Sequence, residues 1–294
     1  MGLFMKVITE DQLRFYNETG YLIVENVLSQ KEIRELGSVT DTFVEKSRSI
    51  TEHNEDFDLE ADHSKENPKL RRIKKPEKQH QVYEKTLKHS GILDVVEDLV
   101  GPNIRTIGAK LNMKAPGGGA QVEWHTDWAF YPHTNDDILE VGVPLDDMEI
   151  ENGCLMAIPG SHKWDAISHH EDGVFVGAVS EDDFNMEDAV PFVLKAGSIS
   201  LHHVRALHGS APNMSNRPRR LLLQGYMAAD AFPLQSNLSS SEEWEDWNSK
   251  ILRGESTNKP RLENVPVVFP QPKPEGVGSI FEIQEKLKKS HYKK

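Results

Sequence analysis

The residues best suited to chemistry in this sequence are His125 and Asp127, a histidine and a carboxylate two positions apart. On an extended strand alternate side chains point to the same face, so both could reach one point. His208, which is followed by Gly209 and Ser210, offers a third ligand. Two histidines and one carboxylate on one face of an octahedron leave three positions open, an arrangement typical of non-heme Fe(II) oxygenases.

By itself, the pair of His125 and Asp127 is weak evidence for a metal site. The chain contains 13 histidines, so a histidine two residues from an aspartate will also arise by chance. A surface histidine beside a solvated aspartate is therefore the alternative. The surrounding motifs, and the elements that carry them, have to decide between these two interpretations.

The first part of the chain predicts helices. Thr9 is a favourable N-cap for a first helix, and Ser29 with Glu32 forms the pattern of a capping box for a second. Residues 21–24, between the two, predict a short apolar strand. Residues 82–99 predict one or two further helices, which would pack against the outside of a barrel.

After residue 101 the pattern changes to short strands separated by turns. Strand-like runs occupy residues 104–113, 139–145, 154–158, 190–194, 198–201 and 221–227. Short strands between turns rich in Gly, Pro, Asn and Asp favour an all-β barrel or a jelly roll. The predicted fold class is therefore mainly β with flanking α-helices.

Two segments lie outside this pattern. Residues 47–69 are polar and charged, which favours an exposed loop, with a mobile lid over an active site as the alternative. From residue 230 onward the chain is polar and rich in proline, and we interpret it as an extension that wraps the barrel. We thus expect one domain over residues 1–294, with a helical part (about 1–101), a jelly-roll core (about 102–229) and the extension (about 230–294).

Composition excludes several classes of protein. The formal net charge of −13 argues against a nucleic-acid binder, and no run approaches the roughly 20 apolar residues of a membrane span. The single cysteine, Cys154, cannot form an intramolecular disulfide, so the fold does not depend on an oxidising compartment. We expect a soluble, cytoplasmic protein that acts on a small molecule, and nothing in the sequence specifies an oligomeric state.

Four motifs follow one another along the chain, and their combination identifies a protein family more specifically than any one of them. They are Trp-His-x-Asp-Trp at 124–128, Glu-Asn-Gly-Cys-Leu at 151–155, Pro-Gly-Ser-His-Lys at 159–163 and His-Gly-Ser at 208–210. With these motifs the sequence resembles the phytanoyl-CoA dioxygenase family of Fe(II)- and 2-oxoglutarate-dependent oxygenases, from residue 12 to about 227. The resemblance implies a double-stranded β-helix, a cupin-like jelly roll.

The resemblance also implies roles for single residues. His125, Asp127 and His208 match the iron ligands, whereas His202 and His203 do not precede the Gly-Ser of the family pattern. His162 is interpreted as a structural turn residue. An arginine suits a carboxylate because its planar fork binds both oxygens.

The cosubstrate residues are also implied by the resemblance. Arg219 matches the arginine that grips the far carboxylate of 2-oxoglutarate, with Arg217 and Arg220 as close competitors. Ser210 matches a hydroxyl at the cosubstrate, and Lys74 lies near a family lysine of the same site. Lys110 stands where some relatives contact 2-oxoglutarate with a methionine, a departure that points to a different substrate.

The implied reaction is the oxidation of a small organic substrate by O2 with 2-oxoglutarate as cosubstrate, which releases succinate and CO2. Asp127 favours hydroxylation, because relatives that halogenate lack this carboxylate. Two alternatives remain open: a cupin-like metal-binding protein that uses no 2-oxoglutarate, and a catalytically silent relative that acts as a binding module. A cosubstrate anchor at Arg219 would separate an oxygenase from the first.

Overall fold

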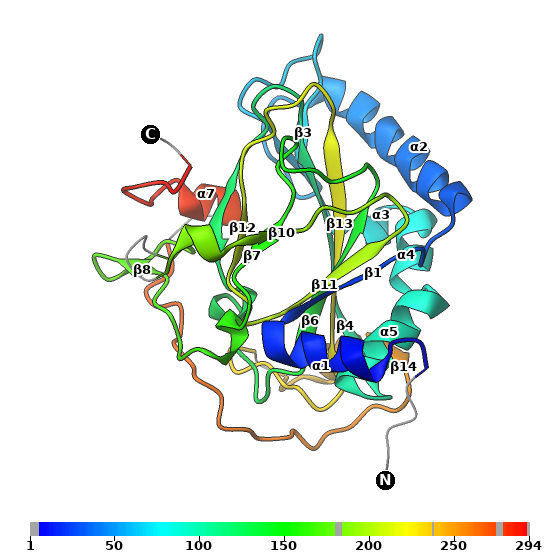
Figure 1. Ribbon diagram of the computed structural model, residues 1–294, viewed down its shortest axis with the longest axis vertical. Helices are drawn as coiled ribbons and strands as arrows, with labels where there is room; N and C mark the ends of the chain where they lie inside the picture. The colour runs from blue at the N-terminus through cyan, green and yellow to red at the C-terminus, as the bar shows by residue number, and fades with distance from the viewer. Residues whose placement is uncertain (1–5, 180–183, 237, 275–278, 293–294) are drawn as a thin grey trace.

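The computed structural model describes residues 6–179, 184–236, 238–274 and 279–292. Two antiparallel sheets form its centre (Figure 1). The large sheet has the order β1-β11-β6-β13-β4-β3-β2, with β14 paired to β4, and the small sheet has the order β10-β7-β12-β5. Within the described part of the chain this arrangement confirms the predicted β-rich fold with flanking helices.

The strands of the large sheet are β1 (Tyr21–Val24), β2 (Phe57–Leu59), β3 (Leu70–Lys74), β4 (Ile104–Lys114), β6 (Ile138–Pro144), β11 (Ile199–His203), β13 (Arg219–Ala228) and β14 (Ile251–Arg253). Those of the small sheet are β5 (Val122–His125), β7 (Met156–Ala157), β10 (Val190–Pro191) and β12 (His208–Ser210). A separate hairpin joins β8 (His170–Glu171) to β9 (Val174–Phe175).

The helices are α1 (Glu10–Thr19), α2 (Gln30–Lys46), α3 (Pro76–Gln79), α4 (Gln81–Leu87), α5 (Ser90–Val100), α6 (Ser241–Ser249) and α7 (Ile280–Gln284), with short 3-10 turns at η1 (Ser47–Ser49), η2 (Asp127–Ala129), η3 (Ser161–Lys163) and η5 (Met186–Asp188). The N-cap at Thr9 and the capping box at Ser29 are both formed, as the sequence predicts, and Thr9 completes a capping box with Gln12 as well. The stretch 82–99 is divided between α4 and α5.

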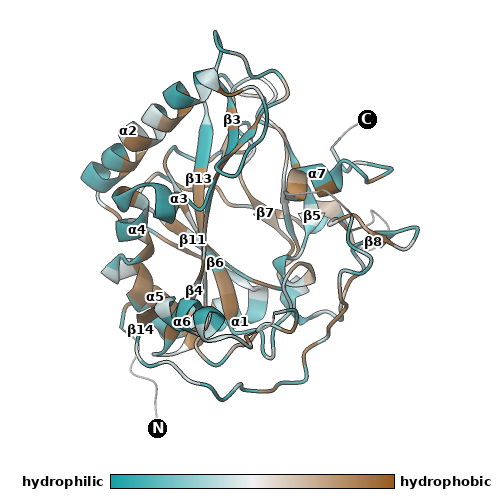
Figure 2. Ribbon diagram, turned by 180° about the vertical axis from the view of Figure 1, so that it is seen from behind, coloured by the Kyte–Doolittle hydropathy of each residue, from teal (hydrophilic) through white to brown (hydrophobic). Residues whose placement is uncertain are grey.

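Helices α2, α4 and α5 cover the outer face of the large sheet, so the sheet is buried on two sides (Figures 1 and 2). Leu36 of α2, Tyr83 of α4 and Ile92 of α5 share one apolar cluster with Leu111 of β4 and Tyr226 of β13. Removing this apolar surface from water is the main driving force that holds the helices on the sheet.

A second apolar cluster lies between the two sheets. Leu221 and Leu223 of β13 pack there with Leu155 and with Ala157 of the small sheet. Leu222 of the same strand faces the helical side. Because successive side chains alternate between the two faces of a strand, β13 is buried on both, and its inner face lines the space in which a site can form.

The interpretation of residues 47–69 as an exposed loop is wrong for its middle part. Phe57, Asp58 and Leu59 form the buried strand β2 at the edge of the large sheet. Phe57 and Leu59 supply the apolar side chains, and Lys74 lies 2.7 Å from the carboxylate of Asp58. The strand was not recognised in the sequence because the charged residues around it suggest an exposed loop. The ionic partner of Asp58 is Lys74, which lies on the neighbouring strand β3.

The chain beyond residue 230 follows the lower edge of the molecule in Figure 1 and returns toward the small sheet at α7. The indole nitrogen of Trp128 donates a hydrogen bond to the Pro266 carbonyl at 2.7 Å, which attaches the extension to the turn after β5. Helix α7 is one short turn of five residues that ends at Gln284, and it buries Phe281.

Candidate metal centre and cosubstrate site

Neighbouring strands of the small sheet bring His125 and His208 together. The two residues are direct cross-strand partners in the antiparallel pair of β5 and β12, and their ring centroids lie 4.2 Å apart. Asp127 follows after Thr126 at the start of η2. The expectation of one extended strand through both ligands is therefore wrong: β5 ends at His125, and the turn of η2 brings the carboxylate back to the rings.

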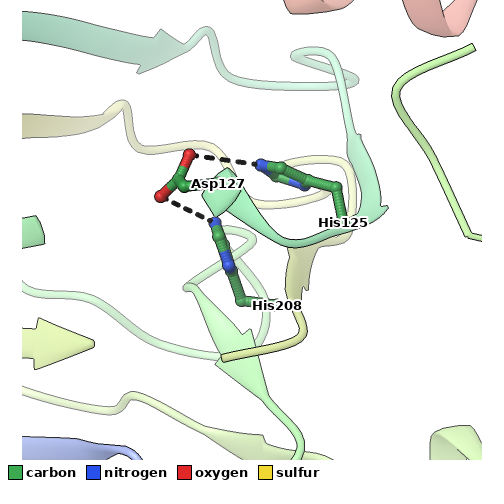
Figure 3. Close-up of side chains that lie close together, drawn as sticks. All are labelled: His125, Asp127 and His208. Carbon is green, nitrogen blue, oxygen red and sulfur yellow. Dashed lines mark ion pairs between the residues drawn. The ribbon is translucent and has the colours of Figure 1, made fainter. Parts of the chain in front are cut away.

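Backbone hydrogen bonds fix both imidazoles. Nδ1 of His125 lies 2.8 Å from the Glu123 carbonyl, and Nδ1 of His208 lies 2.9 Å from the Ala206 carbonyl. A carbonyl can only accept, so both Nδ1 atoms carry the proton and both Nε2 atoms keep a lone pair. Each Nε2 lies 3.9 Å from a carboxylate oxygen of Asp127 (Figure 3).

The electrostatics of the three residues suit metal binding. Burial lowers the pKa of His125 to about 4, and burial together with His125 lowers the pKa of His208 well below its usual value. Burial opposes ionisation of Asp127, but the charge of Lys110 and the ring of His202, 3.5 Å away, outweigh it and hold the pKa of that carboxyl well below its usual range. At neutral pH the site thus offers two neutral imidazoles and one carboxylate.

These donors fit a divalent iron. One ligand atom from each of His125, Asp127 and His208 lies within 4.8 Å of the others, and all three residues are buried. Oδ2 of Asp127 is buried without a hydrogen-bond donor, which would be costly unless a cation were its partner. A set of two imidazoles and one carboxylate with open positions is the ligand set of non-heme Fe(II) oxygenases.

A cavity of about 320 Å³ opens beside the three residues. Its lining includes the ligands together with a second group of polar side chains, namely Arg72, Lys110, Asn112, His202, Ser210 and Arg219. The small sheet and its following turn supply the ligands and Ser210, whereas the large sheet supplies the three cations. An anion bound in this cavity would therefore lie between the two sheets.

Arg219 begins β13 and enters this cavity. It is 3% exposed, and within the described residues its guanidinium has no carboxylate partner, while its Nε is buried without an acceptor. Burial lowers the pKa of Arg219 to about 10, which still leaves it charged at neutral pH. A carboxylate from a ligand would satisfy both the charge and the unpaired donor.

The two competing arginines have partners elsewhere. Arg217 lies before the first residue of β13 and pairs with Glu149 in an exposed position. Arg220 points away from Arg219, as expected from strand alternation, and binds Asp146 at 2.7 Å. Only Arg219 of the three lines the cavity.

Ser210 lies beside Arg219 and is held by a lysine that the sequence argument missed. The ammonium of Lys114 donates to the Ser210 hydroxyl at 2.7 Å and to the backbone carbonyls of Ser210 and Ala211. Because the Ser210 oxygen accepts from Lys114, its own proton is free for a ligand in the cavity. Burial and the neighbouring charge of Arg219 lower the pKa of Lys114 well below its usual value.

The two other lysines named from the sequence lie in different surroundings. Lys74 binds Asp58 and the Asn54 carbonyl and is not part of the cavity lining. Arg72, two residues earlier on β3, lines the cavity instead and donates to Asn112 at 3.1 Å. Lys110 lines the cavity at the metal end, 3.8 Å from Asp127.

Two further histidines and two aromatic residues complete the description of the site and its surroundings. His202 lies 3.5 Å from Asp127 but outside the three-residue cluster. His162 is buried and donates to the Asn17 carbonyl at 3.3 Å, in agreement with a structural role. Trp128 packs in the core, whereas Phe130 lines the cavity and meets the His125 ring edge to face at 5.9 Å.

A pattern in the sequence could have found the missed residues. Lys110, Asn112 and Lys114 alternate along β4, and alternate residues on a strand share one face. Asn112 pairs in register with Arg72, and Lys114 with Arg219. Three polar side chains at this spacing, alternating with the buried Leu111 and Met113, indicate a polar cavity on that face rather than a core.

The fold and the site define the class. A jelly roll with a buried ligand set of two histidines and one aspartate, and with a buried unpaired arginine in the same cavity, has the parts of an Fe(II)- and 2-oxoglutarate-dependent oxygenase. Comparison with known proteins agrees. Residues 16–221 match the family model for phytanoyl-CoA dioxygenase (PhyH), and the chain belongs to this family.

Curated relatives extend the match over nearly the whole chain. A probable alpha-ketoglutarate-dependent hypophosphite dioxygenase of Stutzerimonas stutzeri is 35% identical over 290 residues, which cover 96% of this chain and 99% of the relative. The peroxisomal phytanoyl-CoA dioxygenase of Homo sapiens is 24% identical over 262 residues, with 80% and 73% coverage. The chain is therefore an Fe(II)- and 2-oxoglutarate-dependent dioxygenase, with O2 as the second cosubstrate.

Solved structures support the fold. EctD from S. alaskensis with bound Fe superposes with a TM-score of 0.70 at 21% identity, covering 87% of this chain and 90% of that one. EctD with 2-oxoglutarate and 5-hydroxyectoine gives a TM-score of 0.63 at the same identity, covering 78% and 79%.

Among the described residues, no helix is long and apolar enough to span a membrane.

Proposed function

We propose that this dioxygenase hydroxylates a small phosphorus oxyanion of the hypophosphite class. The observation that carries the proposal is the similarity to the probable hypophosphite dioxygenase, at 35% identity over 96% of this chain and 99% of the relative. The match to human phytanoyl-CoA dioxygenase is weaker, at 24% identity. The proposal replaces the small organic substrate expected from the sequence with a small inorganic one.

The cavity supports a small anionic substrate. Its volume of about 320 Å³ lies at the lower end of the range of ligand pockets, roughly 300–1,000 Å³, and must also hold the cosubstrate. Three cations, Arg72, Lys110 and Arg219, line it. A single bound dicarboxylate would leave positive charge over for a second anion, and the remaining space favours a compact one.

We infer the following roles for the residues. His125, Asp127 and His208 would hold the iron, which, when bound, supplies the activation of O2. Arg219 would bind the far carboxylate of 2-oxoglutarate through two parallel hydrogen bonds, and Ser210 would donate its hydroxyl proton to the same group. Arg72 and Asn112, paired at 3.1 Å, would close the side of the cavity between the two anions.

The proposed reaction accounts for both atoms of O2 and for the four electrons that reduce it. One atom of O2 enters a P–H bond of hypophosphite, so that this bond breaks and P–O and O–H bonds form to give phosphite. The other atom enters 2-oxoglutarate, which loses CO2 and becomes succinate. Two electrons from the P–H bond and two from 2-oxoglutarate reduce O2, so no further reductant is needed.

Product analysis tests the proposal. Protein purified without oxygen would receive Fe(II), 2-oxoglutarate and hypophosphite and then O2, with succinate measured by chromatography and phosphite by phosphorus NMR. We expect phosphite and succinate in equal amounts, and neither product with His208→Ala. Succinate formation that hypophosphite does not stimulate, with no phosphite, would refute the substrate.

We also infer one oxygenase domain over residues 1–294 and a cytoplasmic location. The participation of Ser279, Ile280 and Ile283 in the cavity lining supports a single domain, because the last segment then belongs to the same site as β4 and β13. The single, buried Cys154 is in keeping with a reducing compartment. Limited proteolysis checks the first point, since one domain should resist cleavage between its parts.

A further inference from the structure

The inner face of β4 carries two lysines in different positions. Lys114 lies at the end of the strand beside Arg219 and Ser210, whereas Lys110 lies beside Asp127. Four residues of extended strand separate their Cα atoms by roughly 13 Å. The far carboxylate of the cosubstrate belongs to the first position, so the charge of Lys110 at the metal end needs another explanation.

The charges around Lys110 come from three elements. Glu140 of β6 lies 3.6 Å from its ammonium, Asp127 of η2 lies 3.8 Å away, and Arg72 of β3 repels it. Two carboxylates and one cation thus surround the ammonium, and the two carboxylates belong to β6 and η2.

The ammonium nevertheless donates none of its protons within the described residues at hydrogen-bond distance. Both carboxylates lie beyond 3.5 Å, and the side chain remains 30% exposed toward the cavity. Asp127 would give its charge to the metal, which leaves Glu140 as the carboxylate paired with Lys110 within the described part of the chain. A lysine has three N–H donors, so at least two would be free for a ligand.

Lys110 also lies where two cavities meet. A second hollow of about 320 Å³ is lined by residues 107–109, His133 and Glu140, and it shares Lys110, Tyr131 and Leu223 with the metal cavity. The hydroxyl of Tyr131 donates to Glu140 at 3.4 Å, so that the carboxylate is held beside the lysine. A small anion can therefore approach Lys110 from either hollow.

We propose that Lys110 is the receptor for the substrate's oxyanion, with Glu140 and Tyr131 as its positioning residues. The ligand class is a compact tetrahedral oxyanion of phosphorus. Lys110 would hold the oxygen atoms of this anion while a P–H bond faces the metal. The inference rests on the proposed function and deepens it, since it names the residue that selects an anion over a neutral substrate.

The competing role for Lys110 is contact with 2-oxoglutarate, as the family resemblance suggests. The two roles predict different binding defects. A cosubstrate contact would weaken 2-oxoglutarate in the absence of any substrate, whereas a substrate receptor would leave that affinity unchanged. Binding experiments without oxygen can separate the two, because no turnover consumes either ligand.

Calorimetry on Lys110→Met, Lys110→Arg and the exposed control Lys85→Met provides this test. Each protein, loaded with Fe(II) under nitrogen, is titrated first with 2-oxoglutarate and then with hypophosphite. For Lys110→Met we expect the Kd of hypophosphite to rise about 10- to 100-fold, the loss typical of hydrogen bonds to a charged group. The Kd of 2-oxoglutarate should stay within about 3-fold, and Lys110→Arg should recover part of the loss.

Two results would overturn the inference. One is a Lys110→Met protein that binds hypophosphite as the wild type does. The other is a protein that loses affinity for 2-oxoglutarate instead. Iron content and circular dichroism of each variant establish that the fold and the metal site are intact.

Failure of the proposed function gives a separate result. If the wild type neither binds nor converts hypophosphite, the substrate assignment falls, and the same titration is made with phosphite, methylphosphonate and sulfate. The inference about Lys110 survives if one of these anions binds the wild type and loses affinity in Lys110→Met. If none does, the inference falls as well.

Discussion

The two sheets contribute to the site in different ways. The small sheet and the turn after β5 supply His125, Asp127 and His208, all within one compact cluster. The large sheet supplies Arg72, Lys110 and Arg219 from three strands that lie side by side. The small sheet and its turn thus gather the donors for a cation, and the large sheet contributes three positively charged side chains to the cavity.

The two sheets also differ in how firmly their side chains are fixed before a ligand binds. Both imidazoles are fixed by backbone carbonyls, so the metal site needs little rearrangement. On the large sheet, Arg219 has a buried Nε without an acceptor, and Lys110 donates no close hydrogen bond among the described residues. The fold therefore fixes the proposed metal ligands in advance, whereas the proposed anion-binding residues keep donors that a bound ligand would satisfy.

The largest effect is expected for a change in the three proposed metal ligands. Asp127→Ala removes the only carboxylate among the three ligands, so iron binding and turnover should both be lost while the jelly roll remains folded. Metal analysis and succinate formation measure the two losses, and circular dichroism measures the fold. Asp188→Ala, at an exposed position, is the matched control and should keep both. An Asp127→Ala protein with full activity would contradict the assignment of Asp127 as a metal ligand.

A smaller but still large effect is expected for Arg219→Met. Loss of a buried arginine that holds a carboxylate typically costs about 3–5 kcal/mol, so kcat/KM for 2-oxoglutarate should fall by at least about 100-fold. Steady-state kinetics with varied 2-oxoglutarate measure it. The exposed, Glu149-paired Arg217 provides the control, and Arg217→Met should change kcat/KM by less than about 3-fold. Equal effects of the two variants would contradict the role of Arg219.

Lys114→Met should have a moderate effect. Without Lys114, the hydroxyl of Ser210 no longer has a fixed donor, so it can turn away from the cosubstrate. We expect KM for 2-oxoglutarate to rise by about 10-fold with kcat little changed. Ser210→Ala should give a similar rise, and the double variant should not multiply the two effects, because both remove the same hydrogen bond. Multiplying effects would show that Lys114 acts independently of Ser210.

The smallest effect is a dependence of stability on pH. Burial lowers the pKa of His133 to about 4 and that of His203 to about 3, against about 6.5 in an unfolded chain. As the pH falls below about 6.5, the unfolded chain binds protons that the folded protein cannot, so the free energy of unfolding decreases. Each histidine should contribute about 1–2 kcal/mol of this loss by pH 5.

Thermal unfolding of the metal-free protein at pH 7 and pH 5 measures this decrease. The midpoint should be lower at pH 5, and His133→Gln should reduce the difference between the two values. A midpoint that does not change over this range would show that these histidines take up protons in the folded state. Removing the metal keeps His125 and His208 from adding the release of iron to the result.

The three proposed metal ligands could be picked out from the sequence because they lie in compact motifs, and the structure brings them together. His125 and Asp127 are two residues apart, and His208 carries the Gly-Ser that follows it. The local conformation was still wrong, since Asp127 lies in a 3-10 turn and not on the strand. The three residues still meet in the structure, because a short turn and an extended strand both bring the carboxylate near the rings.

The anion-binding side was harder to predict because it is assembled across strands. Lys114 meets Arg219 only through the register of β4 with β13, and Arg72 meets Asn112 only through β3. Lys74 and Arg72 share alternate positions on β3, and only the structure shows that Asp58 binds Lys74 outside the cavity. Strand β2 was not predicted either, because its buried Asp58 needs an ionic partner, and that partner, Lys74, lies on β3.

The most direct test measures iron and 2-oxoglutarate binding separately, without oxygen, in the wild type, Asp127→Ala and Arg219→Met. The division between the two sheets predicts that Asp127→Ala binds no iron. Arg219→Met should keep iron in about equimolar amount but bind 2-oxoglutarate at least about 100-fold more weakly. An Arg219→Met protein that binds 2-oxoglutarate as tightly as the wild type, or that loses its iron, would contradict this account.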